Sequence, residues 1–110
     1  MTYEVREECG YHVVLLVGDV DLSCSPGARQ VILDCLDRGH ATLVDLSQVT
    51  YIDSSGVASL VEGFQKAKEK TLRFGLIDVS EAAMNVIELA RLDKVFPIHA
   101  DIRARFEADS

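Results

Sequence analysis

A run of consecutive apolar residues at 13–17 constrains the fold of this chain more than any other feature. A β-strand points successive side chains to opposite faces of its sheet, so a strand that is apolar at every position is covered on both faces or nearly so. The run predicts a strand over 11–17 near the centre of a sheet. Tyr3 and Val5 predict a partner strand, joined to the first by a turn at Glu8-Cys9-Gly10, where glycine supplies the permissive backbone.

Helical patterns alternate with short apolar segments in the next part of the chain. Ser25 as N-cap, Pro26 at the first helical position and Gly39 as the C-terminal stop predict a first helix. Residues 42–46 follow as a short buried strand, and the chain then enters a loop. Residues 53–70 predict the clearest helix, capped by Asp53 or Ser54, with a buried stripe formed by apolar residues three and four positions apart: Val57, Leu60, Val61 and Phe64.

The last third of the chain repeats this alternation. Residues 72–77 predict another strand, and Ser80 is expected to cap a third helix. Pro97 marks a break, near a short strand, before a final helix from about Asp101. The inward face of the third helix is expected to comprise four apolar residues: Ala83, Met84, Ile87 and Ala90.

The order of these elements predicts an α/β fold. A hairpin followed by right-handed crossovers gives a mixed sheet of four to five strands with about four helices. A chain of 110 residues is large enough for one core and too small for two ordinary ones, so we expect a single domain over 1–110.

Composition and charge exclude several classes of function. Eleven basic and eighteen acidic residues give a net charge of -7, which disfavours nucleic acid and anionic membranes and favours a basic partner. The acidic N-terminus does not resemble a signal peptide, and no apolar run approaches the ~20 residues that span a bilayer, so we expect a cytoplasmic protein without membrane insertion. The three cysteines show no metal-ligand or disulfide spacing and are interpreted as reduced thiols.

The most informative segment joins the strand at 42–46 to the helix at 53–70. Asp53, Ser54 and Ser55 place three side-chain oxygens around the unpaired N–H groups of a helix start, and Gly56 leaves the backbone open to close approach. Taken alone, this tetrapeptide indicates a well-capped helix start.

The longer pattern resembles the signature of the STAS family. Residues 45–56 match Asp-x-Ser-x-Val-x-x-Ile-Asp-Ser-Ser-Gly, which leads into an apolar helix. Gly18-Asp19-Val20-Asp21 is similar to the family's Gly-Glu-hydrophobic-Asp element, and residues 92–96 are similar to its closing segment. The resemblance covers most of the chain and is to the anti-sigma-factor-antagonist type, which implies the STAS fold.

The resemblance also implies a partner switch. The phosphoacceptor of such antagonists is the second serine of Asp-Ser-Ser-Gly, which is Ser55 here, with Ser54 as the lower-ranked candidate. The unphosphorylated antagonist would bind a serine kinase that doubles as an anti-sigma factor and so release the kinase's target; phosphorylation would end this binding. A metal-dependent serine phosphatase would reset the switch. The chain itself would need no cofactor and would not be an enzyme.

A partner surface is expected around this serine. Helical spacing places Ser55, Ser59, Glu62 and Lys66 on one face, although an ordinary solvated face has the same pattern. Family resemblance is the main reason to add Asp21 and Ser23. The expected partner-binding set comprises residues from both helix starts and the second helix: Asp21, Ser23, Asp53, Ser54, Ser55, Gly56, Ser59 and Glu62.

Other functions are less well supported by the residues. The Gly-x-Ser-x-Gly elbow of hydrolases is absent around Ser55, and no motif links the three histidines, His12, His40 and His99, to it. The Gly-x-x-x-x-Gly-Lys loop of nucleotide-binding proteins is also absent. The main alternative is the cytoplasmic STAS subunit of a lipid-transport ATPase complex. An antagonist that switches a complex other than a sigma factor also stays open.

Overall fold

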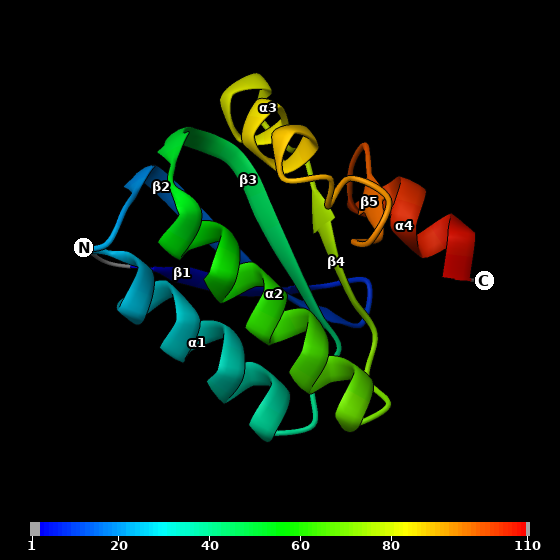
Figure 1. Ribbon diagram of the computed structural model, residues 1–110. Helices are drawn as coiled ribbons and strands as arrows, with labels where there is room; N and C mark the ends of the chain where they lie inside the picture. Colours follow the sequence, from blue (N-terminus) through cyan, green and yellow to red (C-terminus); the bar gives the residue numbers. More distant parts are fainter. Residues whose placement is uncertain (1–2, 110) are drawn as a thin grey trace.

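The computed structural model describes residues 3–109 and shows a mixed α/β fold around one five-stranded sheet (Figure 1). The strands are hydrogen-bonded in the order β1-β2-β3-β4-β5. The bounds of the strands are β1 Glu4–Glu8, β2 Tyr11–Val20, β3 Thr42–Ile52, β4 Phe74–Ile77 and β5 Ile98–His99. The bounds of the helices are α1 Ser25–Asp37, α2 Ser54–Glu69, α3 Glu81–Leu89 and α4 Ile102–Asp109.

The predicted N-terminal hairpin is confirmed. Strands β1 and β2 are antiparallel, and all other neighbours in the sheet are parallel, so the sheet is mixed as expected. The two residues between the strands, Cys9 and Gly10, have φ of 54° and 84°. A two-residue hairpin turn with both φ values positive matches the twist of the flanking strands.

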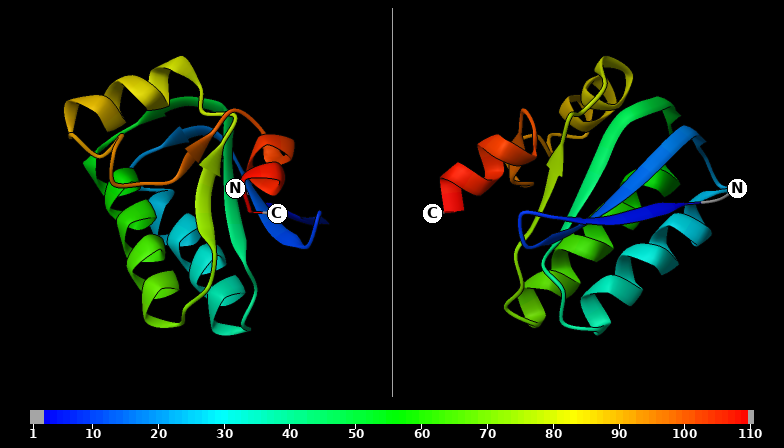
Figure 2. Two further views of the ribbon diagram at one scale, coloured as in Figure 1. Left: turned by 90° about the vertical axis from the view of Figure 1, so that its right-hand side faces the viewer. Right: turned by 180° about the vertical axis from the view of Figure 1, so that it is seen from behind.

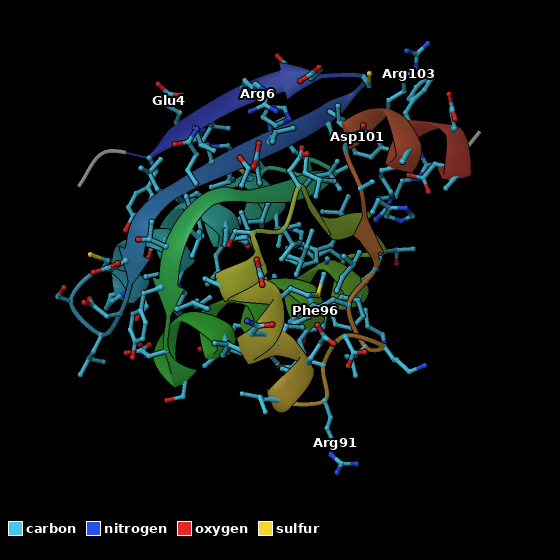
Figure 3. The ribbon with its side chains drawn as sticks, turned by 90° about the horizontal axis from the view of Figure 1, so that it is seen from above. Glu4, Arg6, Arg91, Phe96, Asp101 and Arg103 are labelled. Atoms are coloured by element: carbon cyan, nitrogen blue, oxygen red, sulfur yellow. The ribbon has the colours of Figure 1, made fainter. Side chains whose placement is uncertain are left out.

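Helices cover the two faces of the sheet unequally. Helices α1 and α2 lie side by side across one face, and α4 lies on the other (Figures 1 and 2). Viewed from above, Asp101 and Arg103 lie with α4 on that second side, whereas Phe96 lies on the side of α2 and α3 (Figure 3). The larger core fills the α1–α2 side, and Ile102 of α4 packs against a smaller one formed by Tyr11, Val13, Leu43 and Ile77.

Two strands are longer than the sequence indicates. Strand β3 continues to Ile52, so residues 47–52, expected as a loop, are strand, and β2 continues past Val17 to Val20. The pairing passes through irregularities between Leu15 and Val17 and between Gly18 and Asp19. Gly18, with φ of 82°, shifts the register of β2 without ending the strand. Each strand extends because the other one supplies hydrogen-bonding partners.

Other boundaries also differ from the expectation. The N-cap of α1 is Cys24 and not Ser25, which lies inside the first turn and is buried. The strand predicted over residues 72–77 begins at Phe74, because the chain leaves α2 through a turn at Thr71, whose φ is 57°. Ala90, expected to face inward, is the exposed C-cap of α3. The caps at Asp53 and Ser80 are confirmed.

A buried arginine anchors α4 to the sheet. Arg105 is 6% exposed, and its Nη1 donates a hydrogen bond of 2.8 Å to the backbone carbonyl of Phe74. Its Nε donates to Asp109 Oδ2 at 2.8 Å, and the Tyr11 hydroxyl donates to the same carboxylate. Gly75 leaves room for the guanidinium, because a Cβ there would collide with Nη1. The charge of Arg105 is thus paired and hydrogen-bonded, as a buried charge requires.

Candidate functional site

The candidate site lies where two strands end and two helices begin. Strands β2 and β3 are parallel, so Asp21 after β2 and Asp53 after β3 emerge at the same edge of the sheet. The backbone N–H of Asp53 donates to the carbonyl of Val20 at 3.3 Å, which ties the two strand ends together. The starts of α1 and α2 therefore lie next to each other.

Asp53 caps α2 through one carboxylate oxygen. Its Oδ1 accepts hydrogen bonds from the backbone N–H of Ser55 at 2.9 Å and of Gly56 at 3.1 Å, and from the Ser55 hydroxyl at 2.6 Å. The bonds from the Ser55 hydroxyl and the Gly56 N–H favour the charged form and hold the pKa of Asp53 below its ordinary value. Asp53 thus stays ionised beside Ser55.

The Ser55 hydroxyl also contacts the neighbouring helix. Its oxygen accepts a hydrogen bond of 3.1 Å from the hydroxyl of Ser25, in the first turn of α1. Ser55 is partly exposed and Ser25 is 3% exposed, so an approaching protein can reach the first serine but not the second. Ser54, the lower-ranked candidate, is exposed.

The loop before α1 repeats the arrangement seen at Asp53. Asp21 Oδ1 accepts hydrogen bonds from the hydroxyl of Ser23 at 2.6 Å and from its backbone N–H at 3.0 Å. These two bonds hold the pKa of Asp21 below its ordinary value. Two ionised carboxylates, Asp21 and Asp53, thus flank the starts of α1 and α2.

Gly56 permits the close approach of α2 to the sheet. A Cβ at this position would lie 2.7 Å from the carbonyl oxygen of Val20 and 2.6 Å from Cγ1 of Ile52. Gly56 is buried, so its part in this site is to let the helix start sit against the strand ends.

The expected contact face on α2 needs correction. Ser59 is 5% exposed, and its hydroxyl donates to the backbone carbonyls of Ser25 at 3.2 Å and Ser55 at 3.1 Å. Glu62 is exposed but pairs with Arg29 of α1, and Lys66 lies 3.4 Å from Asp37. Ser59 was wrongly expected to be open to a partner, because helical spacing alone does not reveal which neighbour covers a side chain, whereas Glu62 is exposed beside α1.

Comparison with known proteins identifies the family. The family model described as Mlab, STAS domain matches residues 4–99. The chain belongs to the STAS family. Sequence and fold both agree with this assignment, since the mixed sheet, N-terminal hairpin and four helices match the STAS fold.

This STAS domain is similar to anti-sigma factor antagonists. It is 21% identical over 100 residues to an anti-sigma-B factor antagonist of Listeria monocytogenes, which covers 89% of this chain and 88% of that protein. An anti-sigma factor antagonist from Mycobacterium paratuberculosis has a TM-score of 0.86 at 28% identity, covering 97% of this chain and 92% of the other. The phosphorylated form of SpoIIAA from Bacillus shares the fold, with a TM-score of 0.72 at 16% identity and coverage of 97% and 99%.

Sequence reasoning missed three residues at this edge of the STAS domain. Leu22 is 73% exposed and Tyr51 is 51% exposed, so large apolar side chains lie in the open next to Asp21 and near the end of β3. Ser25 was expected as a cap and is instead the hydrogen-bond partner of Ser55. The one feature of the sequence that could have pointed to these residues is that they lie within or near the two segments that resemble the family's elements.

Two of the three histidines of the STAS domain lie away from Ser55. His12 and His40 stack with ring centroids 3.8 Å apart, at the amino end of β2 and in the connection from α1 to β3. This is the opposite end of those strands from Ser55. Within residues 3–109, no group of three or more His, Cys, Asp or Glu side chains is arranged to hold a metal ion. Over the same residues, no helix is both long and apolar enough to cross a membrane.

Proposed function

We propose that this STAS domain is a phosphorylation-regulated anti-sigma factor antagonist. In its unphosphorylated form it binds a serine kinase that also acts as an anti-sigma factor, and this binding releases the kinase's target. The observation that carries the proposal is the position of Ser55: a partly exposed hydroxyl at the start of α2, hydrogen-bonded to the ionised carboxylate of Asp53. The similarity to anti-sigma factor antagonists supports it.

The charge of a phosphate explains how the switch would work. Phosphorylation adds about -1.5 to -2 charges, and the start of a helix tolerates an anion because its N–H groups point outward. The folded state should therefore survive the modification. A partner packed over Ser55 would have to desolvate the phosphate beside Asp21 and Asp53, which is unfavourable for like charges. Binding is lost while the fold persists.

The exposed residues around Ser55 indicate the chemistry of the partner. Leu22 and Tyr51 offer exposed apolar side chains, and Asp21 and Asp53 add negative charge at the same edge of the sheet. The whole chain carries a net charge of -7. A surface of this kind fits a partner with an apolar centre and basic residues at its rim. Asp21, Ser23, Asp53, Ser54, Ser55 and Gly56 stay in the proposed contact set, Ser59 supports it from within, and Glu62 lies at its margin.

The remaining parts of the circuit belong to the partners. A metal-dependent serine phosphatase would remove the phosphate, and the kinase would supply ATP and its magnesium, so this chain would act without a cofactor or catalytic group of its own. The circuit would operate in the cytoplasm, where kinase, phosphatase and target meet.

A paired capture experiment tests the proposal. Wild type and Ser55→Asp serve as baits in lysate of the native organism, and mass spectrometry identifies what each retains. Gln65→Glu is the matched control, because it adds one negative charge at an exposed position of α2 away from its start. Capture of a serine kinase by wild type and Gln65→Glu, but not by Ser55→Asp, supports partner switching. Equal capture of a transporter ATPase and its permease by all three baits would favour the lipid-transport alternative.

A further inference from the structure

The oxygen of Ser55 is held from two sides. The hydroxyl donates its proton to Asp53 Oδ1 at 2.6 Å and accepts a hydrogen bond from Ser25 Oγ at 3.1 Å. Asp53 belongs to the same turn as Ser55, whereas Ser25 belongs to α1. Only the second contact therefore connects the expected phosphoacceptor to another helix.

Phosphorylation would change these two contacts in opposite ways. The phosphoryl group replaces the proton that Ser55 donates, so the bond to Asp53 is lost and two negative groups face each other. Asp53 stays in place, because its Oδ1 still accepts the backbone N–H groups of Ser55 and Gly56. The phosphate must turn away from this carboxylate. Ser25 already directs its hydroxyl at the Ser55 oxygen, so turning this O–H is enough for it to donate to a phosphate oxygen bonded to the same phosphorus.

The backbone at the start of α1 offers the phosphate little else. The N–H of Ser25 donates to the carbonyl of Asp21 at 2.7 Å, and Pro26 has no N–H. The N–H of Gly27 donates to the carbonyl of Cys24 at 3.1 Å. Among the first three residues of α1, the hydroxyl of Ser25 is thus the donor that points at Ser55.

The position of Ser25 is itself fixed by packing. Ser25 is 3% exposed, and its carbonyl accepts a hydrogen bond from the Ser59 hydroxyl, one turn after Ser55. The Ser59 hydroxyl also donates to the carbonyl of Ser55. The start of α1 is therefore tied to the first turns of α2, and the Ser25 hydroxyl is held in place rather than free to rotate into solvent.

We propose that Ser25 is a positioning residue for the phosphorylated state: its hydroxyl donates a hydrogen bond to the phosphate on Ser55 and holds the phosphate where the starts of α1 and α2 meet. This inference rests on the proposed function, in which Ser55 is the phosphoacceptor. In that reaction the partner kinase transfers the γ-phosphoryl group of ATP. The bond from Ser55 Oγ to phosphorus forms as the bond to the ADP oxygen breaks, and a base of the kinase takes the hydroxyl proton. Ser25 is not itself modified.

Phosphoserine placed genetically at position 55 provides a test that needs no kinase. Phosphorus NMR gives the pH midpoint of the second ionisation of the phosphate in otherwise wild-type protein and in Ser25→Ala. A hydrogen bond from Ser25 favours the dianion, so its removal should raise this midpoint by about 0.5 to 1 pH unit. Ser25→Cys keeps a side chain of similar size with a weak donor and should also raise the midpoint, so it serves if Ser25→Ala does not fold.

Ser59→Ala is the matched control, because the Ser59 hydroxyl donates to the backbone carbonyls of Ser25 and Ser55 but makes no hydrogen bond to the Ser55 hydroxyl. Its midpoint should rise less than that of Ser25→Ala, because this variant loosens the contact between α1 and α2 but leaves the Ser25 donor in place. An unchanged midpoint in Ser25→Ala and Ser25→Cys, or an equal rise in Ser59→Ala, would overturn the role of Ser25. These NMR results do not depend on whether cells phosphorylate Ser55, which a phosphopeptide map tests separately. The role of Ser25 can therefore be disproved while the proposed function stands, and the reverse.

Discussion

One oxygen of Asp53 holds both the backbone and the side chain of Ser55, through hydrogen bonds of 2.9 Å and 2.6 Å. The first bond caps α2, and the second orients the hydroxyl that we propose as the phosphoacceptor. The two roles separate when Ser55 loses its hydroxyl, because the backbone bond does not depend on the side chain. Cap and switch can therefore be tested independently.

Ser55→Asp should abolish most kinase binding while leaving the fold intact. A carboxylate near the start of a helix is favourable to the helix, but it would lie against Asp53 under the partner. We expect the dissociation constant measured by calorimetry to rise by about a hundredfold, which corresponds to about 3 kcal/mol. The thermal midpoint should stay nearly unchanged. A large fall in that midpoint would show that Ser55 acts mainly in capping.

Ser55→Ala should still bind the kinase but should not be phosphorylated. The backbone N–H of Ser55 still donates to Asp53 in this variant, so α2 keeps its cap. A phosphopeptide map after incubation with the kinase and ATP makes the measurement. Ser54→Ala, which removes the neighbouring exposed hydroxyl, is the control and should be modified like the wild type. Unchanged phosphate incorporation in Ser55→Ala would move the site to Ser54.

Gly56→Ala should destabilise the protein, although alanine is the better helix former. The added Cβ would lie 2.7 Å from the Val20 carbonyl oxygen, so α2 would have to shift away from the strand ends. We expect urea unfolding to show a loss of about 1–3 kcal/mol. Gly27→Ala is the control on α1. The three atoms nearest to its Cβ would belong to the Tyr3 side chain, the first at 3.0 Å, and the change in stability should lie between zero and a gain of about 1 kcal/mol. Equal effects of the two changes would contradict this account.

Arg105→Ala should loosen α4. Its removal takes the guanidinium donor from the Phe74 carbonyl and breaks the 2.8 Å ion pair with Asp109, which keeps the Tyr11 hydroxyl. Truncating one member of a buried, hydrogen-bonded pair typically costs about 3 kcal/mol, which urea unfolding can measure. Arg103→Ala, on the same helix but exposed and 3.7 Å from Glu107, should cost about 0.5 kcal/mol or less. A similar small effect of both changes would mean that Arg105 does not anchor α4.

Asp78→Asn should stabilise the protein more at neutral pH than in acid. Although Asp78 is exposed, partial loss of its hydration raises its pKa, the charges of Asp45 and Asp101 raise it further, and Arg6 lowers it by less. Folding therefore favours the protonated form, so this group lowers the free energy of unfolding as the pH rises through its unfolded and then its folded pKa. Urea unfolding from about pH 4 to about pH 7 should show a growing advantage of the variant. Asp93→Asn controls for the loss of one negative charge, and an advantage independent of pH would contradict the prediction.

Most elements could be predicted because their determinants are local. The hairpin follows from an apolar run and a glycine turn, and α2 follows from a cap at Asp53 and a stripe of apolar residues. Boundaries that depend on a distant segment could not be predicted. Residues 47–52 look like a loop, yet they are strand because residues 17–20 lie beside them as a parallel partner. Pairing between residues 30 to 32 positions apart in the chain leaves little trace in either segment alone.

The sequence by itself determined the family pattern, the α/β order and the place of Ser55 at a capped helix start, since these depend on residues close together in the chain. Only the tertiary structure decided what surrounds that serine. It buried Ser59 against α1, exposed Leu22 and Tyr51, and brought the hydroxyl of Ser25 to that of Ser55. Packing of α1 against α2 sets these contacts, and such packing depends on the whole core.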